Sequence, residues 1–148
     1  MAKRKQYLHD TKENAAYLSE VTDIPINVCM AWLRSEPQDV DNPTNPLNII
    51  RHPHNVMQIG ASGMYATYHT TEDGLRDVAT QLQSPKFELL ILAIRSHDPF
   101  RIAKAIEVSP WNNTHYGAKY PVTDGLVVKN YLRLARATKS KGKFHPAP

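Results

Sequence analysis

The chain has 148 residues, enough for one domain with a substantial core and too few for two ordinary domains. Hydrophobic residues at 41% and charged residues at 22% exclude a disordered chain, and no apolar run approaches the roughly 20 residues that span a bilayer. The single cysteine excludes an internal disulfide. The net charge of +4 favours encounter with a polyanion, whether nucleic acid, anionic lipid or bacterial wall polymer.

The N-terminal part of the sequence predicts two helices. Asp10 followed by Glu13 resembles a capping box, with an apolar side after it. Asp23 is placed to cap the next helix, with Pro25 in its first turn. The buried stripe expected for this second helix consists of Ile26, Cys29, Met30 and Leu33. Because three prolines and three asparagines follow within the next residues, the second helix must end at Glu36.

The middle of the chain changes its pattern. Residues 47–69 contain short apolar and β-branched runs around the sequence GASG, which predicts a small, irregular β-hairpin or sheet with a turn at GASG. Helix-opening signals then follow at Thr70, at Ser84-Pro85 and at Asp98-Pro99. The segment SPWNNTHYGAKYP is expected to be a loop, and a last helix is expected from about Thr123.

These elements predict an α+β fold that is mainly α-helical, with a small β insert between the second and third helices. One domain is expected over residues 1–136. Residues 137–148 are basic and are expected to form a flexible C-terminal tail, since such charged ends are usually solvated.

Few motifs carry chemistry. The sequence has no phosphate-cradling glycine-rich loop, no His-Glu-x-x-His motif and no serine in a nucleophile elbow, which argues against nucleotide-dependent, zinc-dependent and serine-hydrolase chemistry. His52-x-His54 is the nearest approach to a metal pair, and both histidines are expected to be ordinary polar residues. Cys29 and Trp111 are expected in the core. No metal or other cofactor is predicted.

Glu36 is the strongest candidate for a catalytic residue. At the C-terminal end of a helix it faces the negative end of the helix dipole, and an apolar neighbour such as Trp32 would help the carboxyl group to keep its proton. A protonated carboxyl group is what a general acid requires. The alternative interpretation is an exposed surface glutamate.

Three segments, in order, resemble the lysozyme-like superfamily of peptidoglycan-cleaving enzymes. AWLRSE...NPLNI is similar to the family segment in which a helix ends in the acid Glu and an Asn-Pro-Leu/Phe-Asn-Ile element begins the β region. YATYHTTEDGLRDVATQL resembles the flagellar and phage glucosaminidases, where an aromatic residue, a Tyr and a Ser or Thr precede a helix with an acidic start. RIAKAIEVSPWNNTHYG is similar to the late segment that leads to a Tyr, so the resemblance covers residues from about 28 to 117.

The resemblance implies a lysozyme-like fold in which Glu36 is the general acid that protonates the glycosidic oxygen. It implies that Asn45 and Asn48 support the loop or contact sugar, and that Tyr68 and Tyr116 contact the N-acetyl sugar. Structural alternatives are a turn for Asn48 and a packed position for Tyr68.

The loop after Glu36 departs from the family. In the family this loop is usually glycine-rich, but in this chain it reads PQDVDNPT, so we expect the wall of the cleft to have a different shape. The second carboxylate stays open: Asp39 and Asp41 lie in this loop, whereas Glu72 and Asp73 are better explained as first-turn helix acids. Because some relatives use one acid and the N-acetyl group of the substrate, hydrolysis and lytic transglycosylation both remain open.

The expected function is cleavage of peptidoglycan glycan strands by a phage-encoded muramidase, N-acetylglucosaminidase or lytic transglycosylase, acting as an endolysin or a virion-associated lysin. No signal peptide is present, so we expect the protein to stay in the host cytoplasm until holin-dependent release, or to be assembled into the virion. Expected partners are glycan strands and, through residues 137–148, anionic wall polymers, with no membrane insertion and no specific nucleic acid. The alternative is a non-catalytic lysozyme-like structural or wall-binding module, which the proline-rich loop favours.

Overall fold

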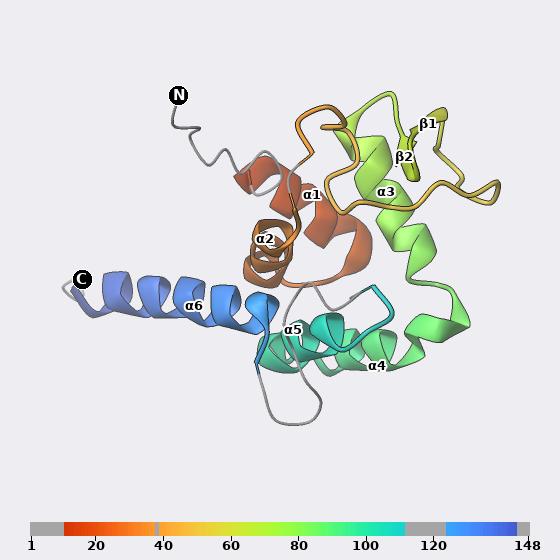
Figure 1. Cartoon of the computed structure of the whole chain (residues 1–148). Helices are drawn as coiled ribbons and strands as arrows, with labels where there is room; N and C mark the ends of the chain where they lie inside the picture. Colours follow the sequence, from red (N-terminus) through yellow and green to blue (C-terminus); the bar gives the residue numbers. More distant parts are fainter. Residues whose placement is uncertain (1–10, 38, 112–123, 145–148) are drawn as a thin grey trace.

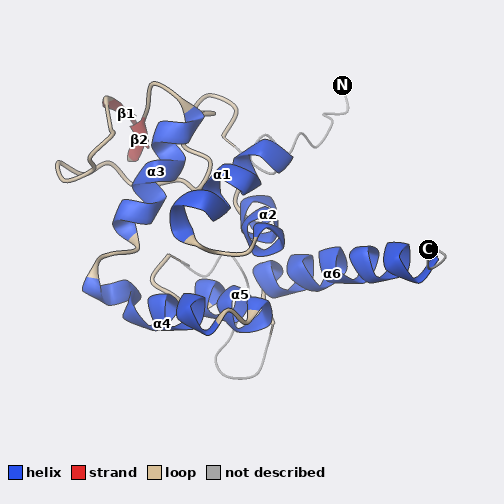
Figure 2. Cartoon of the chain, turned by 180° about the vertical axis from the view of Figure 1, so that it is seen from behind, coloured by secondary structure: helices blue, strands red, loops and turns tan. Residues whose placement is uncertain are grey.

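The computed structural model describes residues 11–37, 39–111 and 124–144, with side chains described as far as residue 137. Its elements are α1 (Lys12–Thr22), α2 (Ile26–Ser35), β1 (Gly60–Ser62), β2 (Tyr65–Thr67), α3 (Thr71–Gln81), the 3-10 helix η1 (Pro85–Phe87), α4 (Glu88–Ser96), α5 (Pro99–Glu107) and α6 (Leu126–Phe144). Helices make up most of the molecule, and the small sheet lies at one end of it (Figure 1, Figure 2). The predicted α+β, mainly helical class and the position of the β insert between α2 and α3 are confirmed.

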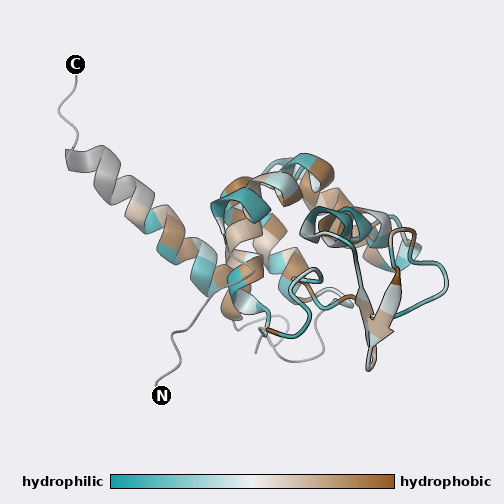
Figure 3. Cartoon of the chain, turned by 90° about the horizontal axis from the view of Figure 1, so that it is seen from above, coloured by the Kyte–Doolittle hydropathy of each residue, from teal (hydrophilic) through white to brown (hydrophobic). Residues whose placement is uncertain are grey.

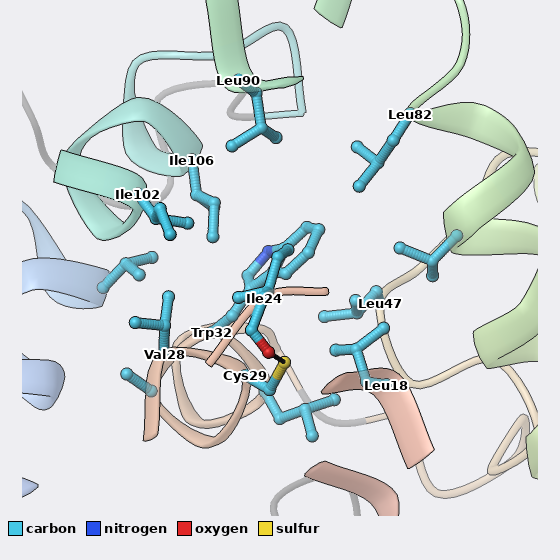
Figure 4. Packing of buried hydrophobic residues seen from close by; sticks show 14 of the residues in the cluster. Leu18, Ile24, Val28, Cys29, Trp32, Leu47, Leu82, Leu90, Ile102 and Ile106 are labelled. Atoms are coloured by element: carbon cyan, nitrogen blue, oxygen red, sulfur yellow. Dashed lines mark hydrogen bonds between the residues drawn. The ribbon is translucent and has the colours of Figure 1, made fainter. Parts of the chain in front are cut away.

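The helix α2 lies at the centre of the fold, where it packs against α1, α5 and α6. Trp32 is fully buried and lies among core side chains from α1, α2, α4 and α5 (Figure 4). The predicted stripe is only partly right, because Cys29 and Leu33 are buried while Ile26 is 38% exposed and Met30 is half-buried. Since three helices surround α2, burial extends well beyond one stripe. Its buried residues are Val28, Cys29, Ala31, Trp32, Leu33 and Ser35.

The thiol of Cys29 belongs to this core, as expected. Its Sγ donates a hydrogen bond to the Ile24 carbonyl oxygen at 3.5 Å. Burial raises the pKa of the Cys29 thiol, and a hydrogen bond with Thr22 opposes this rise only in part. Because the reactive form of cysteine is the thiolate, this residue is a packing group and not a nucleophile.

Two predicted helix caps are wrong. The N-cap of α1 is Thr11, whose hydroxyl oxygen accepts a hydrogen bond from the Asn14 amide. The predicted cap, Asp10, lies outside the described residues. Asp23 ends α1 instead of starting α2: its φ is 65° and its N–H donates to the Ser19 carbonyl oxygen at 2.9 Å. Asp tolerates this left-handed conformation, which terminates helices, so α2 begins after Pro25 without a side-chain cap.

The later helix starts agree better with the sequence. Thr70 caps α3 by accepting from the Asp73 amide at 3.1 Å, and the Asp98 carboxylate accepts from two amides at the start of α5. Ser84 makes no such bond, because η1 separates it from α4. The fourth helix therefore opens one turn later than expected.

The sheet has two short antiparallel strands. The paired residues are Gly60 with Thr67, Ala61 with Ala66, and Ser62 with Tyr65. The predicted turn at GASG is wrong, because its first three residues form β1 and the turn follows at Gly63, whose φ of 59° suits glycine. The apolar runs before it contribute one isolated bridge, between Ile50 and Tyr65.

The last helix differs most from its prediction. It starts at Leu126 and continues to Phe144, so residues 137–144, expected in a flexible tail, belong to α6, and the predicted boundary at residue 136 lies within the helix. Residues 145–148 lie outside the described part. Ala137 and the three lysines of this segment favour a helix, Gly142 does not, and no proline intervenes before Pro146. None of the described helices is both long enough and apolar enough to cross a membrane.

A buried acid holds the start of α6. Glu107 is fully buried at the end of α5, and its Oε2 and Oε1 accept from the backbone amides of Gly125 and Val128, each at 2.8 Å. Lys104 Nζ lies 3.4 Å from the same carboxylate. Amides at a helix N-terminus lack partners within the helix and attract anions, so Glu107 joins α5 to α6.

Replacing Glu107 by Gln should destabilise the protein by about 2 kcal/mol, because the amide keeps the shape but offers one acceptor oxygen for two N–H donors. Urea unfolding measures the change. The matched control is Glu13→Gln, an exposed acid in the first turn of α1, with an expected loss below about 1 kcal/mol. Equal losses in both variants would show that the buried amides do not depend on the carboxylate.

Candidate functional site

Glu36 lies at the C-terminal end of α2. Pro37 forces an extended conformation on the residue before it, and Glu36 has φ −84° and ψ 140°. Its N–H still donates to the Leu33 carbonyl oxygen at 3.4 Å, so the residue is held against the last turn. Glu36 is 5% exposed, and the alternative of an exposed surface glutamate is therefore wrong.

Asn48 connects the start of the β insert to the end of α2. Its Nδ2 lies 3.5 Å from Glu36 Oε1 and 3.2 Å from the Pro37 carbonyl oxygen. Its backbone is left-handed, with φ 57°, and its N–H donates to the Asn45 carbonyl oxygen at 3.2 Å. Asn is one of the few residues other than glycine that tolerate this conformation, so Asn48 holds a turn and also reaches the acid.

Asn45 supports the loop from inside. It is 1% exposed, and its Nδ2 donates to the carbonyl oxygens of Ile49 and Ala66, both at 2.9 Å. Its Oδ1 accepts from the Ile49 amide at 2.8 Å. Asn42 donates to the same Ala66 oxygen at 2.9 Å. Both N–H groups of the Asn45 amide therefore already have partners within the protein. Of the two predicted roles, loop support and sugar contact, these hydrogen bonds match loop support.

Tyr68 is packed inside the protein. It is 4% exposed, and its amide donates to Thr44 Oγ1 at 3.3 Å. Burial raises the pKa of the Tyr68 phenol, and the nearby Asp77 carboxylate raises it further. Among the described residues, no group forms a hydrogen bond of acceptable geometry with the Tyr68 hydroxyl group. This placement matches the packed alternative and lends no support to the predicted sugar contact.

The helix α3 fixes the rest of the β insert through residues that the sequence analysis did not single out. Both carboxylate oxygens of the fully buried Asp77 lie 3.2 Å from the Met57 amide. Gln81 Nε2 donates to Asn55 Oδ1 at 2.7 Å, and Asn55 Nδ2 donates to the Ile50 carbonyl oxygen at 2.9 Å. Helical spacing puts Asp77 opposite the predicted apolar side of Leu75, Val78, Ala79 and Leu82, so the sequence pattern gave no signal for its burial.

Gly74 allows α3 to approach the loop after α2. A Cβ at this position would lie 2.0 Å from the Thr44 carbonyl oxygen and 3.3 Å from the Tyr68 ring. No larger residue fits unless the loop moves. A glycine inside a strong helical pattern was the sequence signal for such a contact.

Trp111 anchors the same loop from the opposite side of the core, as expected. Its Nε1 donates to the Leu47 carbonyl oxygen at 3.1 Å. Its ring meets Trp32 edge to face, with centroids 5.2 Å apart, and lies 5.8 Å from the Phe87 ring. Tyr116, the remaining predicted sugar contact, lies outside the described residues.

The other acids near the loop have local structural roles. Asp39 Oδ1 accepts from the Asp41 amide at 3.0 Å, which closes a turn. Glu72 and Asp73 occupy the first turn of α3, where the helix dipole favours acids, as predicted. These placements leave the identity of a second catalytic carboxylate open.

The two loop histidines contact each other. The His52 and His54 rings are 4.8 Å apart, and His52 Nδ1 accepts from the His54 amide at 3.1 Å. Across the described ranges, no group of three or more His, Cys, Asp or Glu side chains is arranged to hold a metal ion.

Two shallow hollows lie along α4. One of about 490 Å³ is bounded by α4 and α5, and the other, of about 620 Å³, by η1 and α4. Their lining is mainly apolar, Glu36 is not part of it, and the acids in it, Glu88 and Asp98, are exposed. We therefore take the end of α2 as the candidate site, because Glu36 is 5% exposed there and has the Asn48 side chain beside it.

Comparison with protein-family models, with curated proteins and with solved structures gave no match for this chain.

Replacing Gly74 by Ala should destabilise the protein by about 1–3 kcal/mol through overpacking against a backbone oxygen, although Ala is otherwise the better helix former. Thermal unfolding measures this loss of stability. The control is Gly60→Ala, whose Cβ would meet only the side-chain oxygen of Thr67, at 3.1 Å, and should cost less. A stabilised Gly74→Ala variant would show that α3 does not need this close approach.

Proposed function

We propose that this protein cleaves the glycosidic bonds of peptidoglycan glycan strands, with Glu36 as the general acid. The observation that carries the proposal is a carboxyl group 5% exposed at the C-terminal end of the central helix, directly beside the first segment of a β insert. General acids of glycoside hydrolases are carboxyl groups sheltered from water in this way.

A lysozyme-like fold is part of the proposal. The order of elements supports it: α2 ends in the acid, the Asn-Pro-Leu-Asn-Ile segment leads into a small antiparallel sheet, and α3 to α6 follow. In the resemblance described above, the same order surrounds the catalytic glutamate. The fixed loop between α2 and β1 would then form one rim of the substrate groove.

The proposed chemistry is general-acid catalysis. The Glu36 carboxyl group donates its proton to the glycosidic oxygen while the bond from that oxygen to the anomeric carbon breaks, and the bonding electron pair stays on the departing oxygen. The positive charge left on the sugar is stabilised by the N-acetyl group of the substrate or by a second carboxylate. Capture by water gives hydrolysis, and capture by a hydroxyl group of the same sugar gives the transglycosylase product. In either case the attacking oxygen gives up its proton, which returns to the Glu36 carboxylate.

Asn48 is proposed as a positioning residue for the acid. An N–H donor at Glu36 Oε1 favours placement of the proton on the other oxygen, Oε2. Because Asn48 also binds the Pro37 carbonyl oxygen, it fixes the acid relative to the rim of the loop. Such positioning contributes to catalysis by holding the reacting groups in line.

The biological setting belongs to the same proposal: a phage-encoded lysin that reaches the wall after holin-dependent release or as part of a virion. The competing proposal, a wall-binding module without turnover, has the proline-rich loop in its favour. Turnover separates the two.

Replacing Glu36 by Gln should lower the release of soluble fragments from purified peptidoglycan by about 10²–10⁴-fold, because the amide has no acidic proton to transfer. The matched control is Glu20→Gln, an exposed acid in α1, which should keep full activity. Mass spectrometry of the fragments identifies the bond and separates hydrolysis from transglycosylation. If the unmodified protein binds several wall types and cleaves none, the binding module is correct.

Replacing Asn48 by Gly should lower the cleavage rate by about 2- to 10-fold, the loss expected for a hydrogen bond to a neutral carboxyl group. Glycine accepts the left-handed backbone, so the unfolding free energy should stay close to that of the native protein. Asn48→Ala should lose both activity and about 1–2 kcal/mol of stability. Full activity in Asn48→Gly would reduce Asn48 to a turn-forming residue.

A further inference from the structure

The outward face of α6 carries a row of cations. Lys129, Arg133 and Arg136 are all exposed, and spacings of four and three residues place them on one side of the helix. At 1.5 Å per residue the row is about 10 Å long. The C-terminal part of the helix projects away from the rest of the fold (Figure 1, Figure 3).

The rotation of α6 is fixed by its opposite face. Val127 and Val128 are fully buried, and Asn130 Nδ2 donates to Ser35 Oγ at 3.1 Å near the end of α2. Further along, partly buried side chains pack on the same core: Tyr131, Leu132 and Leu134. The helix therefore cannot turn its cations inward without losing these contacts.

The charge of α6 is not balanced within the helix. Residues 126–148 contain no Asp or Glu, and Lys139, Lys141 and Lys143 add three further cations to its final turns. Ion pairs between neighbouring turns are therefore impossible, and like charges at such spacings repel one another. A polyanion laid along the row would relieve this repulsion and release its own counterions.

We propose that the outward face of α6, formed by Lys129, Arg133 and Arg136, binds an anionic bacterial wall polymer with repeating phosphodiester groups. A straight row of cations suits a linear chain of phosphates. A membrane surface fits less well, because interfacial helices insert apolar side chains, and five of those on α6 pack on the core: Val127, Val128, Tyr131, Leu132 and Leu134. A nucleic acid fits less well because this row contains no aromatic side chain for base stacking.

The choice of a wall polymer over other polyanions rests on the proposed function, since such polymers surround the glycan strands. The sequence prediction assigned this contact to residues 137–148. It now begins at Lys129, on a helix whose orientation the core fixes.

The test uses the full chain and purified poly(glycerol phosphate), which contains no glycan strand, so binding does not depend on turnover. The variant is Lys129→Gln/Arg133→Gln/Arg136→Gln. The control, Lys12→Gln/Arg95→Gln/Arg101→Gln, removes the same charge from exposed positions on other helices. Titration calorimetry at several salt concentrations gives the affinity, and circular dichroism checks that α6 remains helical.

The α6 variant should bind about tenfold more weakly near 0.1 M salt, and the slope of log affinity against log salt should fall by about 2, since each phosphate contact contributes about 0.7. The control should keep the affinity and slope of the native protein. Equal losses of affinity in both variants would overturn the proposal and show that only the net charge of the protein attracts the polymer. Tighter binding to single-stranded DNA with the same number of phosphates would overturn the wall-polymer assignment. Loss of wall cleavage in Glu36→Gln bears only on the proposed function.

Discussion

The burial of α2 is the constraint on which the rest of the structure depends. A helix with apolar side chains on several sides must be surrounded, and α1, α5 and α6 supply the cover. Trp32 is the largest fully buried side chain, and its edge-to-face contact with Trp111 brings a residue that follows α5 onto the core of α2. The position of Glu36 follows from this packing, because the helix that carries it cannot shift without opening the core.

The polar composition of the segment after α2 has a structural cause. This segment lies against the core but contains little regular structure, so its carbonyl and amide groups need other partners. Asn42, Asn45 and Asn55 supply them from buried positions, and Asp77 supplies one from α3. Gln81 of α3 donates to the Asn55 side chain and so holds it in place. The prolines remove donors that would otherwise need partners and limit the conformations open to the loop. A loop built in this way holds the neighbourhood of the acid without a larger sheet.

Two buried glutamates show how helix polarity separates their roles. Glu107 faces the N-terminal end of α6, where two backbone amides satisfy its carboxylate, and it works as a structural anchor. Glu36 lies at the C-terminal end of α2, where the backbone presents carbonyl groups and the neighbouring amide donor is the side chain of Asn48. The first environment satisfies an anion with the fixed dipoles of backbone amides. The exposed cations of α6 lie on the side of that helix that faces away from the core.

The sequence by itself determined the mainly helical class, the position of the β insert, the end of α2 at Glu36 and the caps at Thr70 and Asp98, because prolines, capping residues and apolar spacing act over a few neighbouring residues. Only the tertiary structure decided which side chains are enclosed. Burial of Tyr68, the engagement of both Asn45 N–H groups and the close approach at Gly74 all depend on segments distant in the chain. The same holds for the orientation of α6, whose extension past residue 136 follows from helix propensity while its direction is set by packing on α2 and α5. Local patterns specify where helices start and stop, whereas the chemistry of a site depends on which groups water no longer reaches.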